Sequence, residues 1–189
     1  MDYFDLLGMG EKEKDIYFLR MAFLAAKNLS QDVNTQTGAI VVSPDFKLIS
    51  VGANRVNFGD PRRYEGRGER KVFGRPEKYE IITHAERDTQ YCANRAGQTL
   101  VDCTLYTTWV PCDTCAELTV NNGIKRYVTH QSTMDWYNEA RKDTSGRINW
   151  DESIADALGT FERSSVDYIC LNDKIGGVEF LFDDKIREP

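Results

Sequence analysis

The stretch Cys103-Thr-Leu-Tyr-Thr-Thr-Trp109-Val-Pro111-Cys112-Asp-Thr-Cys115 joins a strand-forming run to the start of a helix. Its first part is rich in β-branched and aromatic side chains, which favour a strand. Pro111 suits the start of a helix, because the N–H that proline lacks has no partner there. Cys112 and Cys115 then share one face of the helix, because residues three apart on a helix are neighbours. The stretch therefore predicts a strand that leads two thiol groups to a helix N-terminus.

A histidine and a glutamate stand upstream of this stretch, in His84-Ala-Glu86. One imidazole and two thiolates can hold a zinc ion and leave its fourth coordination position to water, as in a catalytic zinc site. The order H-x-E…P-C-x-x-C is the signature of zinc-dependent nucleobase deaminases, in which a glutamate that is not a ligand moves the protons. We therefore predict one zinc ion with three ligands, His84, Cys112 and Cys115. Glu86 is then the catalytic acid and base.

Other interpretations of these residues are open. A Cys-x-x-Cys pair can be a redox pair or half of a structural zinc site. Thr83-His-Ala-Glu86 is also a capping box, whose glutamate would accept a hydrogen bond from the N–H of the cap residue. The combination favours catalysis, because the chain has only two histidines and one of them stands in the motif. The remaining cysteines show no zinc-finger spacing and are interpreted as small apolar side chains, Cys92, Cys103 and Cys170.

Composition agrees with a compact soluble enzyme. The 189 residues suffice for one domain with a real core. No apolar run approaches a membrane span, and the acidic start Met1-Asp-Tyr-Phe-Asp5 is unlike a signal peptide. Five cysteines without a paired spacing fit the cytoplasm, or the host cytoplasm if the protein is viral. The formal net charge of −6 argues against a nucleic-acid partner, because a phosphate backbone needs a broad basic surface.

Apolar periodicity and turn signals predict an α/β fold. We expect, in chain order, a helix at 15–29, a β-hairpin of 37–43 and 46–52, a polar stretch at 57–80, a helix from 84 to about 97, a strand at 103–109, a helix from 112 to about 123, a strand at 124–130, a helix at 151–161 and a last strand at 178–182. This order is typical of an α/β sandwich, here with the metal between two helix starts. We expect a single domain over 1–189, with a motif-bearing core at about 15–130 and a C-terminal helix and strand in 131–189.

With these motifs the chain resembles the deoxycytidylate (dCMP) deaminases of the cytidine deaminase superfamily, from about Ile16 to His130. The matching stretches besides the zinc motif are Asp15-Ile-Tyr-Phe-Leu, Ser30-Gln-Asp-Val-Asn34-Thr-Gln-Thr-Gly38-Ala-Ile, Gly52-Ala-Asn54, Lys78-Tyr79, Leu105-Tyr106 and Gly123-Ile-Lys125. The resemblance implies a three-layer α/β/α sandwich of the cytidine deaminase type, with a mixed sheet of about five strands flanked by helices. It also implies a homo-oligomer, often a homohexamer.

The resemblance further implies an activity and its ligands. The reaction is zinc-dependent hydrolysis of dCMP to dUMP and ammonia, which supplies dUMP for thymidylate synthesis. Water adds to C4 of cytosine while Glu86 protonates N3 and then the leaving amine. Many members are regulated by dCTP and dTTP, and Mg²⁺ would accompany such a triphosphate effector. Since no cysteine precedes His84, we expect one zinc ion and no second, structural zinc.

Several residues are candidates for substrate binding. By resemblance, Asn54 contacts the substrate sugar and the Ala85 N–H contacts the base carbonyl. Thr35 lies in the matching stretch before the first strand and is a further candidate. Trp109 either offers an aromatic wall to the base or packs in the core at a strand end.

The chain departs from the family pattern at several positions. Arg55 follows the sugar-contacting asparagine where the family commonly has glycine, and Asp88 stands where it often has asparagine. In the family, the loop that carries this glycine takes part in regulation. Because Arg55 replaces the glycine here, control by dCTP and dTTP is in doubt. Arg95 falls where the family has an arginine linked to effector binding. Trp136 or Tyr137 would replace the usual tyrosine of the family.

A basic, glycine-containing segment precedes the zinc motif. Arginines clamp phosphate oxygens in pairs, and glycines let backbone amides approach closely. Acidic residues are interspersed, so a solvated charged loop is the alternative. The basic residues of the segment are Arg62, Arg63, Arg67, Arg70, Lys71, Arg75 and Lys78. The candidates for binding a substrate phosphate or an effector are Arg62, Arg63, Arg75 and Arg95.

Three classes of function remain open. The first is deamination of a free cytosine nucleotide, where the sequence does not separate dCMP from CMP, dCTP or a 5-substituted dCMP. The second is a tRNA or polynucleotide deaminase, which would share the motif and the run Gly52-Ala-Asn54-Arg55, although the acidic balance speaks against it. The third is a catalytically silent zinc protein that only binds nucleotides or partners.

Overall fold

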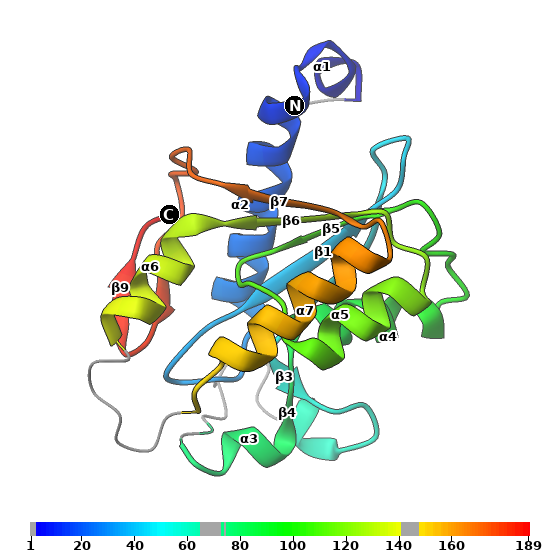
Figure 1. The fold of residues 1–189 in the computed structure, drawn as a ribbon. Coiled ribbons are helices and arrows are strands. Elements are labelled where there is room, and N and C mark those ends of the chain that lie inside the picture. The colour runs from blue at the N-terminus through cyan, green and yellow to red at the C-terminus, as the bar shows by residue number, and fades with distance from the viewer. Residues whose placement is uncertain (1–2, 65–72, 74, 141–147) are drawn as a thin grey trace.

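The structure is a computed structural model that describes residues 3–64, 73, 75–140 and 148–189. In chain order the elements are α1 (Tyr3–Gly8), α2 (Glu11–Leu29), β1 (Gly38–Val42), β2 (Leu48–Ala53), β3 (Arg55–Val56), the 3-10 helix η1 (Pro61–Arg63), α3 (Lys78–Ile81), β4 (Ile82–Thr83), α4 (Ala85–Arg95), β5 (Thr104–Thr107), α5 (Asp113–Asn121), β6 (Arg126–His130), α6 (Gln131–Ala140), α7 (Asp151–Arg163), β7 (Asp167–Leu171), β8 (Phe180–Phe182) and β9 (Lys185–Arg187). The central sheet has five strands in the order β2-β1-β5-β6-β7 (Figure 1). β1 is antiparallel to β2 and β5, whereas β5, β6 and β7 are parallel. The expected α/β fold with a mixed five-stranded sheet is confirmed.

Helices cover both faces of this sheet (Figure 1). Successive side chains of a strand point to opposite faces, and β1 shows the consequence. Ile40 and Val42 pack with α2 in one apolar cluster. Ala39 and Val41 pack with residues of α4, α5 and α7 in the other. The two clusters are the cores of a three-layer α/β/α sandwich.

Two glycines let helices approach the β1–β2 hairpin closely. A Cβ atom on Gly38 would collide with the backbone of α2, and a Cβ atom on Gly52 would collide with the backbone of α4 at Thr89. α4 therefore lies directly against β2, at a distance that a side chain at position 52 would not allow. Because His84 and Glu86 stand at the start of α4, Gly52 helps to fix where these two side chains lie relative to the sheet.

Both halves of the zinc motif stand at helix N-termini. β4 runs into α4 with His84 as the N-cap residue, and the loop after β5 runs into α5 with Cys112 as the N-cap residue. Both cap residues have extended backbone conformations, and neither side chain makes a capping hydrogen bond. Gly97 and Gly123 follow the two helices with φ of 69° and 74°. The predicted ends of the two helices, near 97 and 123, thus coincide with glycines, which adopt positive φ readily.

Other parts of the chain differ from the sequence-based expectation. α2 begins at Glu11 rather than near Asp15, because Gly10 is its N-cap and donates its N–H to the Glu13 carboxylate. The fifth strand of the sheet is β7, whereas the predicted strand at 178–182 contributes β8 to a separate hairpin with β9. α6 was not predicted. None of the described helices combines the length and the apolar character needed to cross a membrane.

Candidate active site

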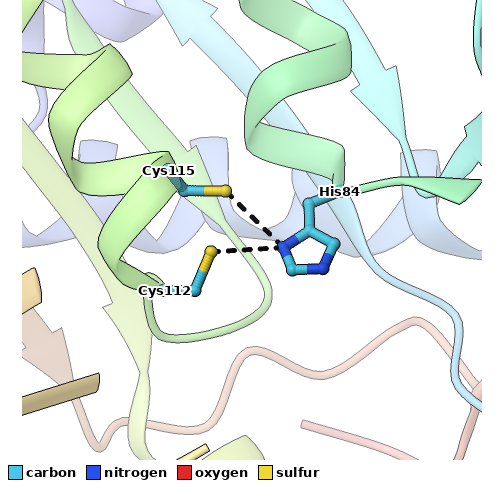
Figure 2. Close-up of side chains that lie close together, drawn as sticks. All are labelled: His84, Cys112 and Cys115. Carbon is cyan, nitrogen blue, oxygen red and sulfur yellow. Dashed lines mark hydrogen bonds between the residues drawn. The ribbon is translucent and has the colours of Figure 1, made fainter. Parts of the chain in front are cut away.

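His84, Cys112 and Cys115 come together at the N-termini of α4 and α5 (Figure 2). The Sγ atoms of Cys112 and Cys115 lie 3.4 and 3.6 Å from His84 Nδ1. One ligand atom from each residue lies within 4.8 Å of the others, and no second such group occurs among the described residues. One nitrogen and two sulfur donors suit zinc, and three protein ligands leave the fourth coordination position open. The donor set therefore fits a catalytic zinc ion.

The two thiols carry their protons unequally. Cys115 donates a hydrogen bond to Cys112, which together with His84 lowers the pKa of Cys112 to about 4. The same hydrogen bond and burial raise the pKa of Cys115 well above its ordinary value. Burial opposes a charge on His84, but the hydrogen bond with Cys112 and the charge of Glu86 outweigh it and raise the pKa of His84. A metal ion would displace these protons, because thiolates and neutral imidazole are the ligating forms.

Glu86 lies beside the candidate ligands and is 3% exposed. The Tyr127 hydroxyl of β6 lies 3.3 Å from Glu86 Oε1 and 3.2 Å from the Trp109 carbonyl oxygen. Burial raises the pKa of Glu86, because the carboxylate loses its hydration. A raised pKa lets the carboxyl group hold and release a proton nearer neutral pH, as a general acid and base must. The capping-box interpretation is not observed, since His84 and not Thr83 is the N-cap of α4.

His84, Glu86 and Cys112 line a cavity of about 690 Å³. This volume lies in the range of small-molecule binding sites. Trp109 and Phe182 form an apolar part of its wall, and their rings stack with centroids 4.9 Å apart and an interplanar angle of 23°. Trp109 therefore lines the cavity and packs against a neighbouring ring at the same time.

Asn54 and Thr35 also line the cavity, but the Asn54 amide is fully engaged. Its Oδ1 accepts hydrogen bonds from Ser30 Oγ at 2.5 Å and from the Thr37 N–H at 2.9 Å. Its Nδ2 donates to the Thr35 carbonyl oxygen at 2.7 Å and to Asp32 Oδ2 at 3.3 Å. An amide side chain has two donors and two acceptor positions. A contact from Asn54 to a substrate sugar thus requires one of these bonds to open.

Two basic side chains of the segment before the motif line the cavity, and both are paired with carboxylates. Arg75 binds Asp183 at 2.9 Å and Asp184 at 3.2 Å. Lys78 Nζ lies 2.8 Å from Asp32 Oδ2, and both side chains are buried. A phosphate group at this part of the cavity would compete with carboxylates that the protein already supplies.

The other residues proposed for phosphate or substrate contacts lie elsewhere. None of the arginines Arg62, Arg63 and Arg95 lines the cavity. Arg62 pairs with Asp60, and Arg63 pairs with Asp88. The Arg95 guanidinium lies 4.7 Å from the Phe58 ring centroid. Ala85 is fully buried at the first position of α4. The candidates Arg67, Arg70 and Lys71 lie outside the described residues.

One wall of the cavity comes from residues outside the zinc motif, of which only Tyr137 was considered from the sequence. Tyr137 of α6, Trp150 before α7 and Asp183 after β8 all line it. The Trp150 ring packs edge-on against the His84 imidazole, with centroids 5.5 Å apart. Of the two aromatic residues considered as the family's tyrosine, Tyr137 lines the cavity, whereas Trp136 packs against β8. Because tertiary packing brings these residues in, no local spacing could have revealed them.

Relatives are found by sequence across most of the chain. Residues 12–131 match the family described as cytidine and deoxycytidylate deaminase zinc-binding region. The deoxycytidylate deaminase of Homo sapiens is 30% identical over 135 residues, which cover 70% of this chain and 71% of that protein. A probable deoxycytidylate deaminase of Caenorhabditis elegans is 32% identical over 120 residues, which cover 62% and 57%.

Solved structures agree on the fold. The dCMP deaminase from the cyanophage S-TIM5, solved in complex with dCMP and dUMP, superposes with a TM-score of 0.61 over 86% of this chain and 99% of that chain. At 17% identity this likeness bears on the fold alone. The sequence match over residues 12–131 and the identity to the human protein show more, namely that this chain belongs to the cytidine and deoxycytidylate deaminase family.

Proposed function

We propose that this chain catalyses the hydrolytic deamination of dCMP to dUMP and ammonia. The observation that carries the proposal is one cavity lined by both His84 and Cys112 of a His/Cys/Cys group and by the buried Glu86. Family membership supports it, and the relatives described above are a deoxycytidylate deaminase and a probable deoxycytidylate deaminase. A catalytically silent zinc protein would have no need to bury a carboxyl group beside an open coordination position.

In the proposed mechanism, His84, Cys112 and Cys115 would hold zinc, which supplies a water activated as a nucleophile near neutral pH. Glu86 takes a proton from the attacking water and places it on N3 of the cytosine ring as C4 becomes tetrahedral. Glu86 then takes the proton of the new C4 hydroxyl and passes it to the amine on C4, so that the C4–N bond breaks, ammonia leaves and the C4 carbonyl of uracil forms. The Tyr127 hydroxyl, 3.3 Å from Glu86 Oε1, keeps this carboxyl group oriented between the two transfers.

Finer parts of the proposal rest on resemblance. They are the supply of dUMP for thymidylate synthesis, a hexameric assembly, and regulation by dCTP and dTTP with Mg²⁺ as companion ion. A cytoplasmic location is proposed from the five cysteines without a paired spacing. Substrate contacts from Asn54, Thr35, Trp109 and the Ala85 N–H stay predictions. Phosphate or effector contacts from Arg62, Arg63, Arg75 and Arg95 stay predictions as well. CMP, dCTP and 5-substituted dCMP are the alternative substrates.

A parallel assay of substrates tests the proposal. Zinc-loaded protein is mixed with dCMP, CMP, dCTP, deoxycytidine and dAMP in separate cuvettes. The ultraviolet absorbance change is followed from cytosine to uracil for the first four and from adenine to hypoxanthine for dAMP. We expect dCMP to be converted fastest. A second series with dCTP or dTTP and Mg²⁺ measures regulation. If no monomeric nucleotide is converted, the proposal is wrong, and modified nucleotides and RNA become the substrates to examine.

A further inference from the structure

Asp88, in the first turn of α4, is bound by two arginine side chains. Arg55 Nε and Nη2 lie 2.9 and 2.6 Å from Asp88 Oδ2, and Arg63 Nη2 lies 2.5 Å from Asp88 Oδ1. The Ala53 N–H, at the end of β2, also donates to Oδ2 at 3.1 Å. The side chains of Asp88 and Arg63 are 1% and 3% exposed. Water therefore competes little with these charge-assisted hydrogen bonds.

Arg55 reaches both sides of His84. Its backbone pairs with Thr83 in the β3–β4 ladder, directly before His84. Its side chain binds Asp88, whose N–H donates to the His84 carbonyl oxygen at 2.9 Å. This bond closes the first turn of α4, which contains Glu86. The metal-ligating histidine and the catalytic glutamate thus lie between two points that one arginine holds.

The second positive charge of the cluster is satisfied locally. Arg63 donates a hydrogen bond to the Val56 carbonyl oxygen at 2.5 Å, and its guanidinium lies 3.8 Å from the Phe58 ring centroid. An aromatic face attracts a guanidinium group. Arg55 is therefore the guanidinium that depends most on the anion at position 88, because removal of one partner from an ion pair leaves an uncompensated charge.

We propose that Asp88, held by Arg55 and Arg63, is a positioning residue for His84 and Glu86. Asp88 does not line the cavity, so it acts through the helix turn rather than on the substrate. It stands where the family often has asparagine, and Arg55 stands where the family commonly has glycine. The two departures from the family pattern form one ion pair, and each compensates for the other.

A double-mutant cycle tests the proposal, with dCMP deamination as one readout. In Asp88→Asn the new amide turns an N–H toward guanidinium donors, and we expect kcat to fall by about 10- to 100-fold with little change in KM. Arg55→Gly alone should lower kcat less, because Arg63 still holds Asp88. The double variant Arg55→Gly/Asp88→Asn should recover most of the kcat lost by Asp88→Asn. Losses that simply multiply would overturn the proposal, because independent sites do not couple.

A second readout does not depend on the substrate. We expect zinc to dissociate into a chelator faster from Asp88→Asn than from the wild type. From the double variant, zinc should dissociate more slowly than from Asp88→Asn. If the wild-type protein fails to convert dCMP, the proposed function is wrong, while the zinc measurements still decide the role of Asp88. Equal zinc dissociation rates in the wild type, the two single variants and the double variant would contradict the proposed role of Asp88.

Asp15→Asn is the matched control. Asp15 is a buried aspartate of α2 that binds Arg126 at 3.0 Å and the Tyr106 hydroxyl at 2.7 Å. Its replacement should lower the thermal midpoint, and we expect the same of Asp88→Asn, because a similar buried network is broken in both. We expect kcat and zinc dissociation to stay within about twofold of the wild type at temperatures where the variant is folded, since effects at distant sites are independent. A kcat loss as large as that of Asp88→Asn would mean that the effect is general destabilisation.

Discussion

Two regions of the chain build the cavity, and they differ in what they supply. The region that matches the family, residues 12–131, supplies the metal-binding group and Glu86. The region beyond it supplies the wall residues Tyr137, Trp150 and Phe182. In the proposed mechanism the first region carries the groups that react, whereas the second shapes the space in which a substrate lies. Substitutions in the first should therefore abolish turnover, and substitutions in the second should change the affinity for the substrate.

Removal of a zinc ligand should give the largest effect. We expect Cys112→Ala to lose bound zinc and to show no measurable turnover of dCMP, because two remaining protein ligands hold zinc poorly. Metal analysis and the absorbance assay measure the two losses. Cys103→Ala, a buried cysteine away from the site, should keep both zinc and turnover. If Cys112→Ala converted dCMP without bound zinc, the first region would not supply the reacting groups as proposed.

Replacement of Glu86 should remove the chemistry and keep the metal. We expect Glu86→Gln to lower kcat by about 10²- to 10⁴-fold, the usual contribution of a general acid and base. Zinc content should stay at the wild-type level, because Glu86 is not a ligand. Glu117→Gln, on the exposed side of α5, is the control with unchanged kcat. A Glu86→Gln variant that turns over at the wild-type rate would refute the assigned role.

Replacement of Phe182 should affect binding more than chemistry. Phe182→Leu nearly keeps the side-chain volume but removes the ring that stacks on Trp109. We expect KM for dCMP to rise by about 3- to 10-fold, in line with the energy of one aromatic pair, with kcat nearly unchanged. Phe180→Leu is the matched control, because Phe180 is equally buried in β8 but does not line the cavity. Equal KM values for the two variants would remove the special role of the cavity wall.

The contribution of the contact between the two regions to the free energy of unfolding should depend slightly on pH. His130, the last residue of β6, lies 2.8 Å through Nε2 from the Asp173 carbonyl oxygen and 2.7 Å through Nδ1 from Ser132 Oγ. Burial lowers the pKa of His130. The unfolded chain, with a histidine pKa of about 6.5, then binds a proton before the folded chain does. The free energy of unfolding should decrease as pH falls below that value and until the folded-state pKa is passed.

The variant His130→Gln isolates this effect. It has no group that titrates at this position, so its urea midpoint should change less between about pH 6.5 and 5 than that of the wild type. All other titrating groups are common to both proteins. Identical slopes of midpoint against pH would show that His130 does not sense protonation at the contact between the regions.

The sequence indicated the fold and the chemical groups where the signal was local. The β-hairpin, the helix after His84 and the strand before Cys112 have strong apolar patterns or glycine ends, and all three are present. Residues His84, Glu86 and Cys112 are set by short spacings at helix starts, and the structure brings them to one cavity.

The rest depended on tertiary packing. β7 is an edge strand whose side chains are half-buried or exposed, so it lacks the apolar run that marks a central strand. Phe182 was noted only as part of a strand, and its stacking on Trp109 joins residues far apart in the chain. Composition is a weak guide to the positions of the arginines, because Arg63 binds a buried aspartate and does not line the cavity, whereas Arg75 does. A count of basic residues cannot say which carboxylates already neutralise them.

The close approach at Gly52 limits how this enzyme can diversify. The backbone of α4 at Thr89 occupies the space that any side chain at position 52 would need. A descendant of this protein therefore cannot enlarge its site by lifting the catalytic helix away from the sheet without also disturbing the histidine and glutamate at its start. Bulkier substrates are better accommodated by changes at Phe182, which lines the cavity and stacks on Trp109 rather than on His84 or Glu86.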